Sequence, residues 1–174
     1  MKKFLLSLVM LCLTCASVMA GSDIKVIDGD KKVFKTAKGE ALLEIIWDGA
    51  TYDDKMPLTD KFPDLKPYQE ASWSGFQDSF NDECKKVKVI RNAQNPRYKF
   101  VIQVTKVDQY FNVMGWVSGN ATKIWGTMTI TDLETNTVLT TIKIKEVNGG
   151  ASPSPTETFS DAFEELAEQV ADLK

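Results

Sequence analysis

The chain has 174 residues, of which 43% are hydrophobic and 26% charged, and its formal net charge at pH 7 is −3. This length allows one globular domain with a sizeable hydrophobic core, and the acidic balance argues against nucleic acid or an anionic membrane as the main partner. The chain contains no histidine, which excludes Ser-His and Cys-His catalysis and any ordinary zinc site.

The first twenty residues are typical of a bacterial secretory leader. Lys2 and Lys3 precede an apolar run over residues 4–15, and Val18-Met19-Ala20 supplies the small residues that a leader peptidase recognises. The run is too short to span a bilayer, which takes about 20 apolar residues. We expect residues 1–20 to be a signal peptide and residues 21–174 a single exported domain, periplasmic or secreted. Because the leader holds two lysines and no acidic residue, its removal changes the net charge from −3 to −5.

Cysteine usage restricts the exported domain further. Cys15 is a poor match to a lipid-attachment site, because Thr14 stands where a small residue is preferred and Cys12 where leucine is. We therefore expect no lipid anchor. Cys12 and Cys15 leave with the leader, so Cys84 remains alone and no internal disulfide is possible.

The N-terminal half predicts two strand regions and one helix. Residues 24–27 could pair with residues 32–35 in a short hairpin, and residues 41–47 form a clear apolar strand. A long polar connection with three prolines follows over residues 50–67, and connections of this length are usually functional or mobile. A helix is predicted over residues 67–86, with lysines in its last turn. Its apolar face has helical spacing and is made of Trp73, Phe76, Phe80 and Cys84.

The C-terminal half predicts three antiparallel strands and a second helix. Alternation over residues 98–105 gives one strand, residues 112–120 a turn-rich link, residues 122–132 a second strand, and residues 138–147 a third. We expect these side chains to point into the core: Ile124, Met128, Ile130, Val138, Ile142 and Ile144. Thr158 and Asp161 resemble a capping box that opens the final helix. The apolar face of that helix consists of Phe159, Phe163, Leu166, Val170 and Leu173.

These elements predict an α/β (α+β) fold, a two-layer sandwich with a mainly antiparallel sheet and two amphipathic helices on one face. The other face would then carry polar side chains, which antiparallel sheets tolerate in contact with water. The polar face is expected to consist of Gln103, Thr105, Thr127, Thr129, Thr131, Thr141 and Lys143.

Candidate chemistry is sparse. Asp53, Asp54, Asp60 and Asp64 could offer oxygen ligands, but neither they nor residues 28–30 have the alternating frame of a calcium loop. Asp132 and Glu134 could belong to a carboxylate hydrolase, yet they also suit an ordinary turn. Cys84 lies on an apolar helix face and is expected to be buried. We therefore predict no catalytic residue, no cofactor and no metal, with a carboxylate-based hydrolase as the enzymatic alternative.

Aromatic residues near polar ones are the most informative surface candidates, because interaction surfaces and carbohydrate platforms use such side chains. Trp73 is expected in the core, while Trp47 could face either side. Trp125 falls on the threonine-bearing face, and three further aromatic residues flank the strand link. The predicted interaction residues are Tyr110, Phe111, Trp116, Trp125, Thr127 and Thr129.

Residues 98–104, 115–119, 123–135 and 159–173 together resemble small secreted proteins of gut and oral Bacteroidetes, whose function is unknown. More distantly, the chain is similar to the envelope α/β domains of the curli-secretion lipoprotein and the penicillin-binding-protein activator lipoprotein. Asn136 stands where those families usually have glycine, and the lipid-anchor cysteine is absent. The resemblance implies an envelope location and action by assembly or contact with other envelope proteins.

The leading hypothesis is an exported, non-enzymatic interaction or assembly domain whose partner is another envelope protein or a second copy of this chain. The alternative is a small-molecule or glycan-binding protein that uses its exposed aromatic residues, with residues 50–67 as a lid.

Overall fold

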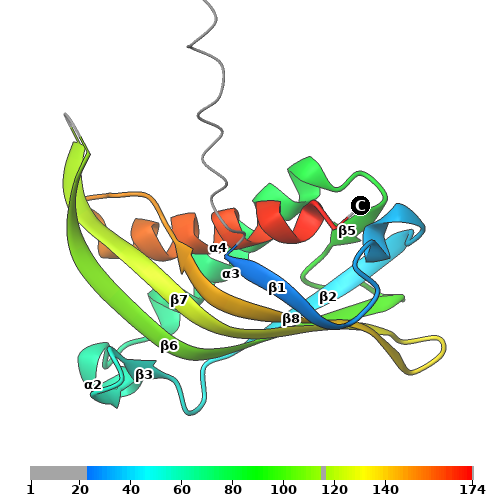
Figure 1. Cartoon of the computed structure of the whole chain (residues 1–174), viewed down its shortest axis with the longest axis horizontal. Coiled ribbons are helices and arrows are strands. Elements are labelled where there is room, and N and C mark those ends of the chain that lie inside the picture. Colours follow the sequence, from blue (N-terminus) through cyan, green and yellow to red (C-terminus); the bar gives the residue numbers. More distant parts are fainter. Residues whose placement is uncertain (1–22, 115–116, 174) are drawn as a thin grey trace, which may run out of the picture.

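The computed structural model describes residues 23–114 and 117–173, which form a curved sheet with helices on one of its faces (Figure 1). The strands are β1 (Ile24–Gly29), β2 (Gly39–Ile46), β3 (Thr51–Tyr52), β4 (Met56–Pro57), β5 (Val87–Val89), β6 (Tyr98–Met114), β7 (Val117–Asp132) and β8 (Thr137–Asn148). The helices are the 3-10 helix η1 (Val33–Lys35), α2 (Leu58–Lys61), α3 (Lys66–Glu83) and α4 (Pro155–Ala171). The two-layer α/β architecture is confirmed.

The strand order along the sheet is β1-β8-β7-β6-β2-β5, with β3 and β4 attached beside β6. Pairing is antiparallel from β1 through β8 and β7 to β6. It is parallel between β6, β2 and β5. A parallel pair needs a long crossover, and α3 provides it between β2 and β6. The sheet is therefore antiparallel along its longest strands and parallel at one side.

The predicted N-terminal hairpin is wrong. β1 pairs with β8, about 115 residues away in sequence, in a register that places Ile24 opposite Ile144. Residues 33–35 form η1 instead of a strand, and Val33 and Phe34 are buried in the core. The edge of the sheet offers β1 a longer partner than a short local hairpin would, and it buries the Ile24 side chain.

The predicted link over residues 112–120 is also largely wrong, because β6 and β7 continue their pairing from Tyr98↔Asp132 up to Met114↔Val117. Gly119 lies within β7 at a point where a neighbouring segment leaves no room for a side chain. A Cβ atom there would lie 2.6 Å from the Ser152 carbonyl oxygen, and Asn120 and Ser152 form a bridge of backbone hydrogen bonds. The residues that suggested a turn therefore serve a close approach between two chain segments.

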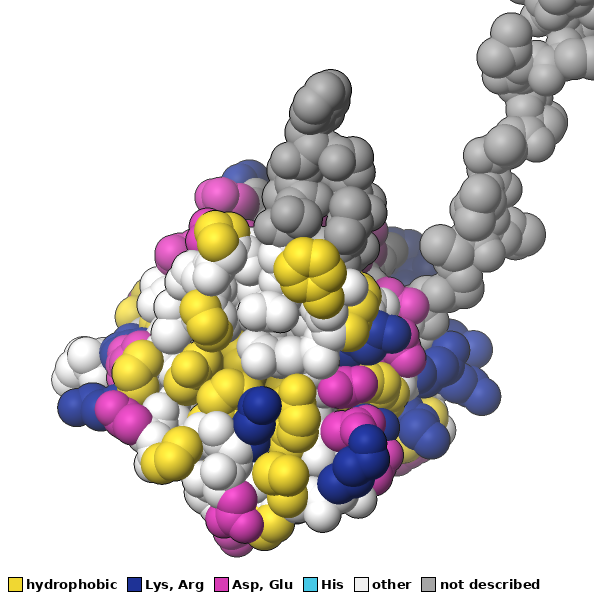
Figure 2. All heavy atoms as spheres, turned by 90° about the vertical axis from the view of Figure 1, so that its left-hand side faces the viewer, with side chains coloured by type: hydrophobic (Ala, Val, Ile, Leu, Met, Phe, Trp, Pro, Cys, Tyr) yellow, Lys and Arg dark blue, Asp and Glu magenta, His cyan; other side chains and the backbone are white. Residues whose placement is uncertain are grey.

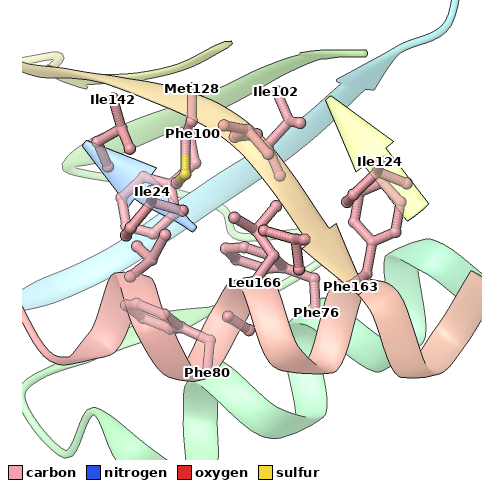
Figure 3. Packing of buried hydrophobic residues seen from close by; sticks show 14 of the residues in the cluster. Ile24, Phe76, Phe80, Phe100, Ile102, Ile124, Met128, Ile142, Phe163 and Leu166 are labelled. Carbon is pink, nitrogen blue, oxygen red and sulfur yellow. The ribbon is translucent and has the colours of Figure 1, made fainter. Parts of the chain in front are cut away.

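Helices α3 and α4 lie side by side over one sheet face and bury the core between the layers (Figures 1 and 3). Figure 3 shows Phe76 and Phe80 from α3, with Phe163 and Leu166 from α4, pointing toward the sheet. Trp47 is buried on this side, with its ring centroid 5.7 Å from that of Phe163. Trp73, expected in the core, is only partly buried. Its indole donates to the Leu43 carbonyl at 3.3 Å.

Both helix boundaries differ from the prediction. α3 ends at Glu83, and Cys84 is its C-terminal cap. The lysines expected in the last turn therefore follow the helix. Lys85 and Lys88 still donate to backbone carbonyls of that turn. α4 begins one turn earlier than expected, because Ser154 is the N-cap and accepts the Glu157 N–H. Thr158, predicted to cap, is fully buried.

Residues 50–67 are packed against the domain. β3 pairs with β6, while Leu58 and Phe62 are buried in the core. No helix within residues 23–114 and 117–173 is long and apolar enough to cross a membrane.

Candidate functional site

The sheet face opposite the helices, called here the outer face, is the surface that the sequence predicted to be polar. Neither α3 nor α4 covers it (Figure 1). None of the seven side chains assigned to it is buried, which confirms that prediction. Three half-buried apolar residues of β2 and β6, namely Leu42, Ile46 and Val101, alternate with the buried positions of those strands and lie on the same face.

Strand β7 carries three of the predicted interaction residues on this face. Ile124 and Met128 are buried in the core, so the alternation of the strand turns Trp125, Thr127 and Thr129 outward, where each is half-buried. Val138, expected in the core, is 51% exposed on the outer face instead. The pairing register of β7 and β8 shifts between Ile130 and Thr131, near the start of β8. This irregularity turns the Val138 side chain from the core side to the outer face.

Tyr110 and Phe111 do not form one cluster with Trp125. They are successive residues of β6 and point to opposite faces. Tyr110 points outward, with the Lys123 ammonium 4.8 Å from its ring centroid and its hydroxyl donating to Asn148 at 3.4 Å. Phe111 is on the helix side and 69% exposed. Trp116 lies outside the described residues.

A pocket of about 430 Å³ adjoins Trp125 on the outer face. Its lining residues are Asp54, Thr105, Lys106, Trp125, Gly126, Thr127, Lys143 and Ile144. A bulge between Val104 and Lys106 places Lys106 opposite Trp125. The Lys106 ammonium lies 4.6 Å from the indole centroid and 2.5 Å from the Asp54 carboxylate. The hydrogen bond with Asp54 raises the pKa of Lys106 above its usual value, so this ammonium is charged at neutral pH.

Sequence reasoning placed Lys143 on the outer face but did not detect its neighbour. Lys25 of β1 is paired directly with Lys143 of β8, and both side chains are exposed. Alternation within each strand could show that both lysines point outward, but only the register shows that they meet.

Figure 2 shows the end of the molecule that carries the β6–β7 hairpin. Hydrophobic side chains are grouped there among charged side chains of both signs.

Three of the carboxylates considered for metal binding are engaged within the chain, and one of them, Asp64, accepts the Lys66 N–H at 3.2 Å. Asp53 and Asp54 adopt left-handed backbone conformations and pair with Lys55 and Lys106. No group of three or more potential metal-ligating side chains occurs within the described part of the chain.

Asp132 acts as a turn residue beside Arg97. Its carboxylate accepts the Glu134 N–H at 2.9 Å and the Arg97 guanidinium at 3.2 Å. Burial raises the pKa of Asp132, but these hydrogen bonds outweigh it and hold the pKa below its usual value. Asp132 and Arg97 also line a cavity of 500 Å³ at the other end of the sheet. Because the carboxylate is already bound by donors from this chain, we do not assign a reaction to it.

Cys84 is buried, as expected, with 5% of its surface exposed. It lies at the end of α3 beside Phe34, under Lys35, Lys85 and Lys86, in a cavity of 290 Å³.

A scan against protein-family models finds no match to this chain, and a comparison with curated proteins also finds none. Among solved structures, it is similar to the PelC dodecamer from Paraburkholderia phytofirmans, with 14% identity, a TM-score of 0.45, and coverage of 83% of this chain and 96% of that chain. It is also similar to a Xanthomonas campestris protein of the DUF330 family, with 15% identity, a TM-score of 0.39, and coverage of 78% and 82%.

A third similar structure is a minor lipoprotein from Acinetobacter baumannii, with 11% identity, a TM-score of 0.32, and coverage of 76% of this chain and 89% of that chain. The resemblance to the curli-secretion and penicillin-binding-protein activator lipoproteins, and to Bacteroidetes proteins, stays a prediction.

Proposed function

We propose that the protein is an exported envelope protein that acts by binding another envelope protein through its outer face, without catalysis. The observation that carries this proposal is the outer face itself: both long helices pack on the opposite side, and Trp125 is half-buried on the face that they leave uncovered. The leader-like residues 1–20 support export.

The composition of the outer face supports contact with a partner. Threonine offers a methyl group and a hydroxyl group, so Thr127 and Thr129 suit both apolar contact and hydrogen bonding. Leu42, Ile46 and Val101 add apolar area that a partner could bury. A large aromatic side chain such as Trp125 is the kind of residue that dominates binding energy at interfaces.

The absence of catalysis is part of the proposal. General acid–base chemistry needs a carboxylate free to reach a substrate. Asp54 and Asp132, by contrast, are held by Lys106 and Arg97.

A second candidate, a glycan- or small-molecule-binding protein, is favoured by one observation. The 430 Å³ pocket beside Trp125 is within the size range of small-molecule sites, about 300–1,000 Å³.

The proposal is tested by capture of envelope proteins with the purified protein as bait, followed by measurement of affinity for the captured partner. We expect Trp125→Asp and Val101→Asp to weaken that affinity about tenfold or more, because both place a charge in the contact area. Asp78→Lys, on the exposed side of α3, is the control and should bind as the unchanged protein does. A partner that binds both outer-face variants normally would refute the proposal.

A further inference from the structure

Two lysines of the outer face are placed where their charges repel. Lys25 on β1 and Lys143 on β8 are directly opposite in the antiparallel register. Side chains in such a pair have Cβ atoms about 4.5–5.5 Å apart, and like charges there are destabilising. Both side chains are exposed, and no carboxylate of residues 23–114 or 117–173 forms an ion pair with either.

The lysines of β6 and β7 on this face are neutralised by ion pairs. Lys99 and Lys106 of β6 pair with Glu44 at 2.6 Å and with Asp54 at 2.5 Å. Lys123 of β7 pairs with Glu146 at 2.6 Å. Local ion pairing is therefore the rule for β6 and β7, and the Lys25–Lys143 pair departs from it. The departure leaves two positive charges available to an external anion.

The paired lysines adjoin the Trp125 pocket. Lys143 lines the pocket and lies directly opposite Thr127 of β7, while Lys25 is one strand further toward the sheet edge. The charged residues that line the pocket are Lys106, Lys143 and Asp54. The carboxylates of Asp54, Asp53 and Asp108 all act on Lys106, whereas Lys143 has Lys25 as its cross-strand neighbour.

An aromatic surface, nearby hydroxyls and an uncompensated positive pair together define a ligand class. A pyranose ring has an apolar C–H face that packs against indole and hydroxyls that exchange hydrogen bonds with groups such as those of Thr127 and Thr105. The cavity volume of 430 Å³ suits a ligand of this size. A carboxylate or sulfate on the sugar would relieve the repulsion between Lys25 and Lys143.

We propose that the Trp125 pocket binds an anionic saccharide, with its sugar ring beside the Trp125 indole and the Lys106 ammonium that lies over it, and with its acidic group between Lys25 and Lys143. This inference rests on the outer face being a binding surface, and it names the ligand class of the glycan-binding candidate.

The test is a titration of the purified protein with trigalacturonic acid, in which binding is measured by tryptophan fluorescence and by calorimetry. Its methyl ester has the same sugar skeleton without the charge, and triglutamate has charge without sugar. We expect saturable binding of trigalacturonic acid, about tenfold weaker binding of the ester, and weak binding of triglutamate. Binding should also weaken as salt concentration rises.

The variants locate the site. Lys25→Gln/Lys143→Gln removes two exposed charges without touching the core, and we expect it to weaken binding of trigalacturonic acid about tenfold or more. Trp125→Ala should weaken both the acid and the ester, since it removes the surface for the ring. Lys99→Gln, on the same face but paired with Glu44, is the matched control and should leave the affinity unchanged.

The outcomes separate this inference from the proposed function. Absence of saturable binding, equal binding of triglutamate, or unchanged binding by the double lysine variant would each overturn the saccharide site. If partner capture still depends on Trp125 and Val101 in that case, the protein-binding function stands. If instead partner binding ignores the outer-face variants while the acid binds as expected, only the protein-binding function is overturned.

Discussion

At the scale of single residues, a buried hydroxyl network fastens the β6–β7 hairpin to α4. The Thr158 hydroxyl donates to the Pro155 carbonyl at 2.8 Å and lies 2.6 Å from the Thr122 hydroxyl. The Gln109 amide reaches the Thr122 hydroxyl at 3.2 Å. Thr122 and Thr158 are fully buried. Because the Thr158 hydroxyl donates to Pro155, the Thr122 hydroxyl donates to Thr158.

Thr158→Val tests this network. The change keeps the shape of the side chain but leaves the buried Thr122 O–H without its acceptor, so the free energy of unfolding should fall by about 1–3 kcal/mol. Urea denaturation measures the change. In the double variant Thr122→Val/Thr158→Val, the loss should be smaller than the sum of the two single losses, because neither hydroxyl is then left unpaired. Simple additivity would contradict the coupling.

Asp161 provides a prediction about pH. Burial, followed by repulsion from Glu164 and Glu157, raises the pKa of Asp161 above its usual value of 3.8. The folded state therefore binds the proton more tightly than the unfolded state. The ionised carboxylate consequently lowers the free energy of unfolding as pH rises from 3.8 through the higher folded-state pKa.

Asp161→Asn removes that penalty. We expect the variant to unfold at a higher temperature than the unchanged protein at pH 7, with the difference shrinking as pH falls below 3.8. Asp78→Asn, an exposed carboxylate of α3, makes the same change of charge and serves as the control. An equal effect of both variants would show that net charge, rather than the surroundings of Asp161, is responsible.

At the scale of elements, the bulges in the sheet decide which side chains meet. The irregularity between Val104 and Lys106 brings Lys106 opposite Trp125. The shift between Ile130 and Thr131 turns Val138 outward. At the bulge between Val104 and Lys106, Gly126 lets β7 approach β6 closely, since a Cβ atom at Gly126 would lie 2.1 Å from the Gln103 carbonyl oxygen. The composition of the outer face thus depends on local breaks in a regular alternation.

The cross-strand lysine pair gives a prediction with a clear sign. Lys143→Glu converts a repulsive pair with Lys25 into an attractive one, so the free energy of unfolding should rise by about 0.5 kcal/mol. Lys99→Glu makes the opposite change, because it places a second carboxylate beside Glu44, and it should lower stability. Denaturation at low salt measures both. Equal shifts in the two variants would contradict the pairing read from the register.

At the scale of the whole molecule, one helical layer closes one sheet face and also holds the packed connection over residues 50–67. The Phe159 ring of α4 lies 5.5 Å from Phe62 and 4.9 Å from Tyr68, between centroids. This aromatic cluster joins α4, α3 and the connection, so α4 organises the region that the sequence treated as a loose loop.

Phe159→Ala tests this role. The side chain is fully buried, and its truncation should reduce the free energy of unfolding by about 3–5 kcal/mol. Phe111→Ala is the matched control, since Phe111 is 69% exposed and surface changes have effects within about 0.5 kcal/mol. Calorimetric melting of both variants measures the difference. Similar losses from both would contradict the organising role of α4.

Much of the fold could be predicted from periodicity. The inward residues Met128 and Ile142 and the outward residues Trp125 and Thr127 followed from alternation, and both long helices followed from their apolar faces. The partner of β1, the parallel position of β2 and the extension of β6 and β7 through residues 112–114 and 117–120 could not be predicted, because pairing between distant segments leaves no local pattern.

The candidate site divides in the same way. Trp125, Thr127 and Thr129 were assigned to one face correctly, but Tyr110 and Phe111 were grouped although alternation separates them. The pocket beside Trp125 depends on Lys106, Asp54 and Lys143, which come from three distant segments. No spacing in the sequence marks that combination.

The sequence by itself determined the two-layer class, the polar character of one sheet face and the absence of histidine chemistry, because composition and residue periodicity are local properties. Only the tertiary structure decided that Lys25 meets Lys143, that Lys106 lies over Trp125 and that Thr158 is buried rather than a cap. These contacts arise from strand register, bulges and the docking of α4. They depend on the free energy of the whole packed chain, which no single segment contains.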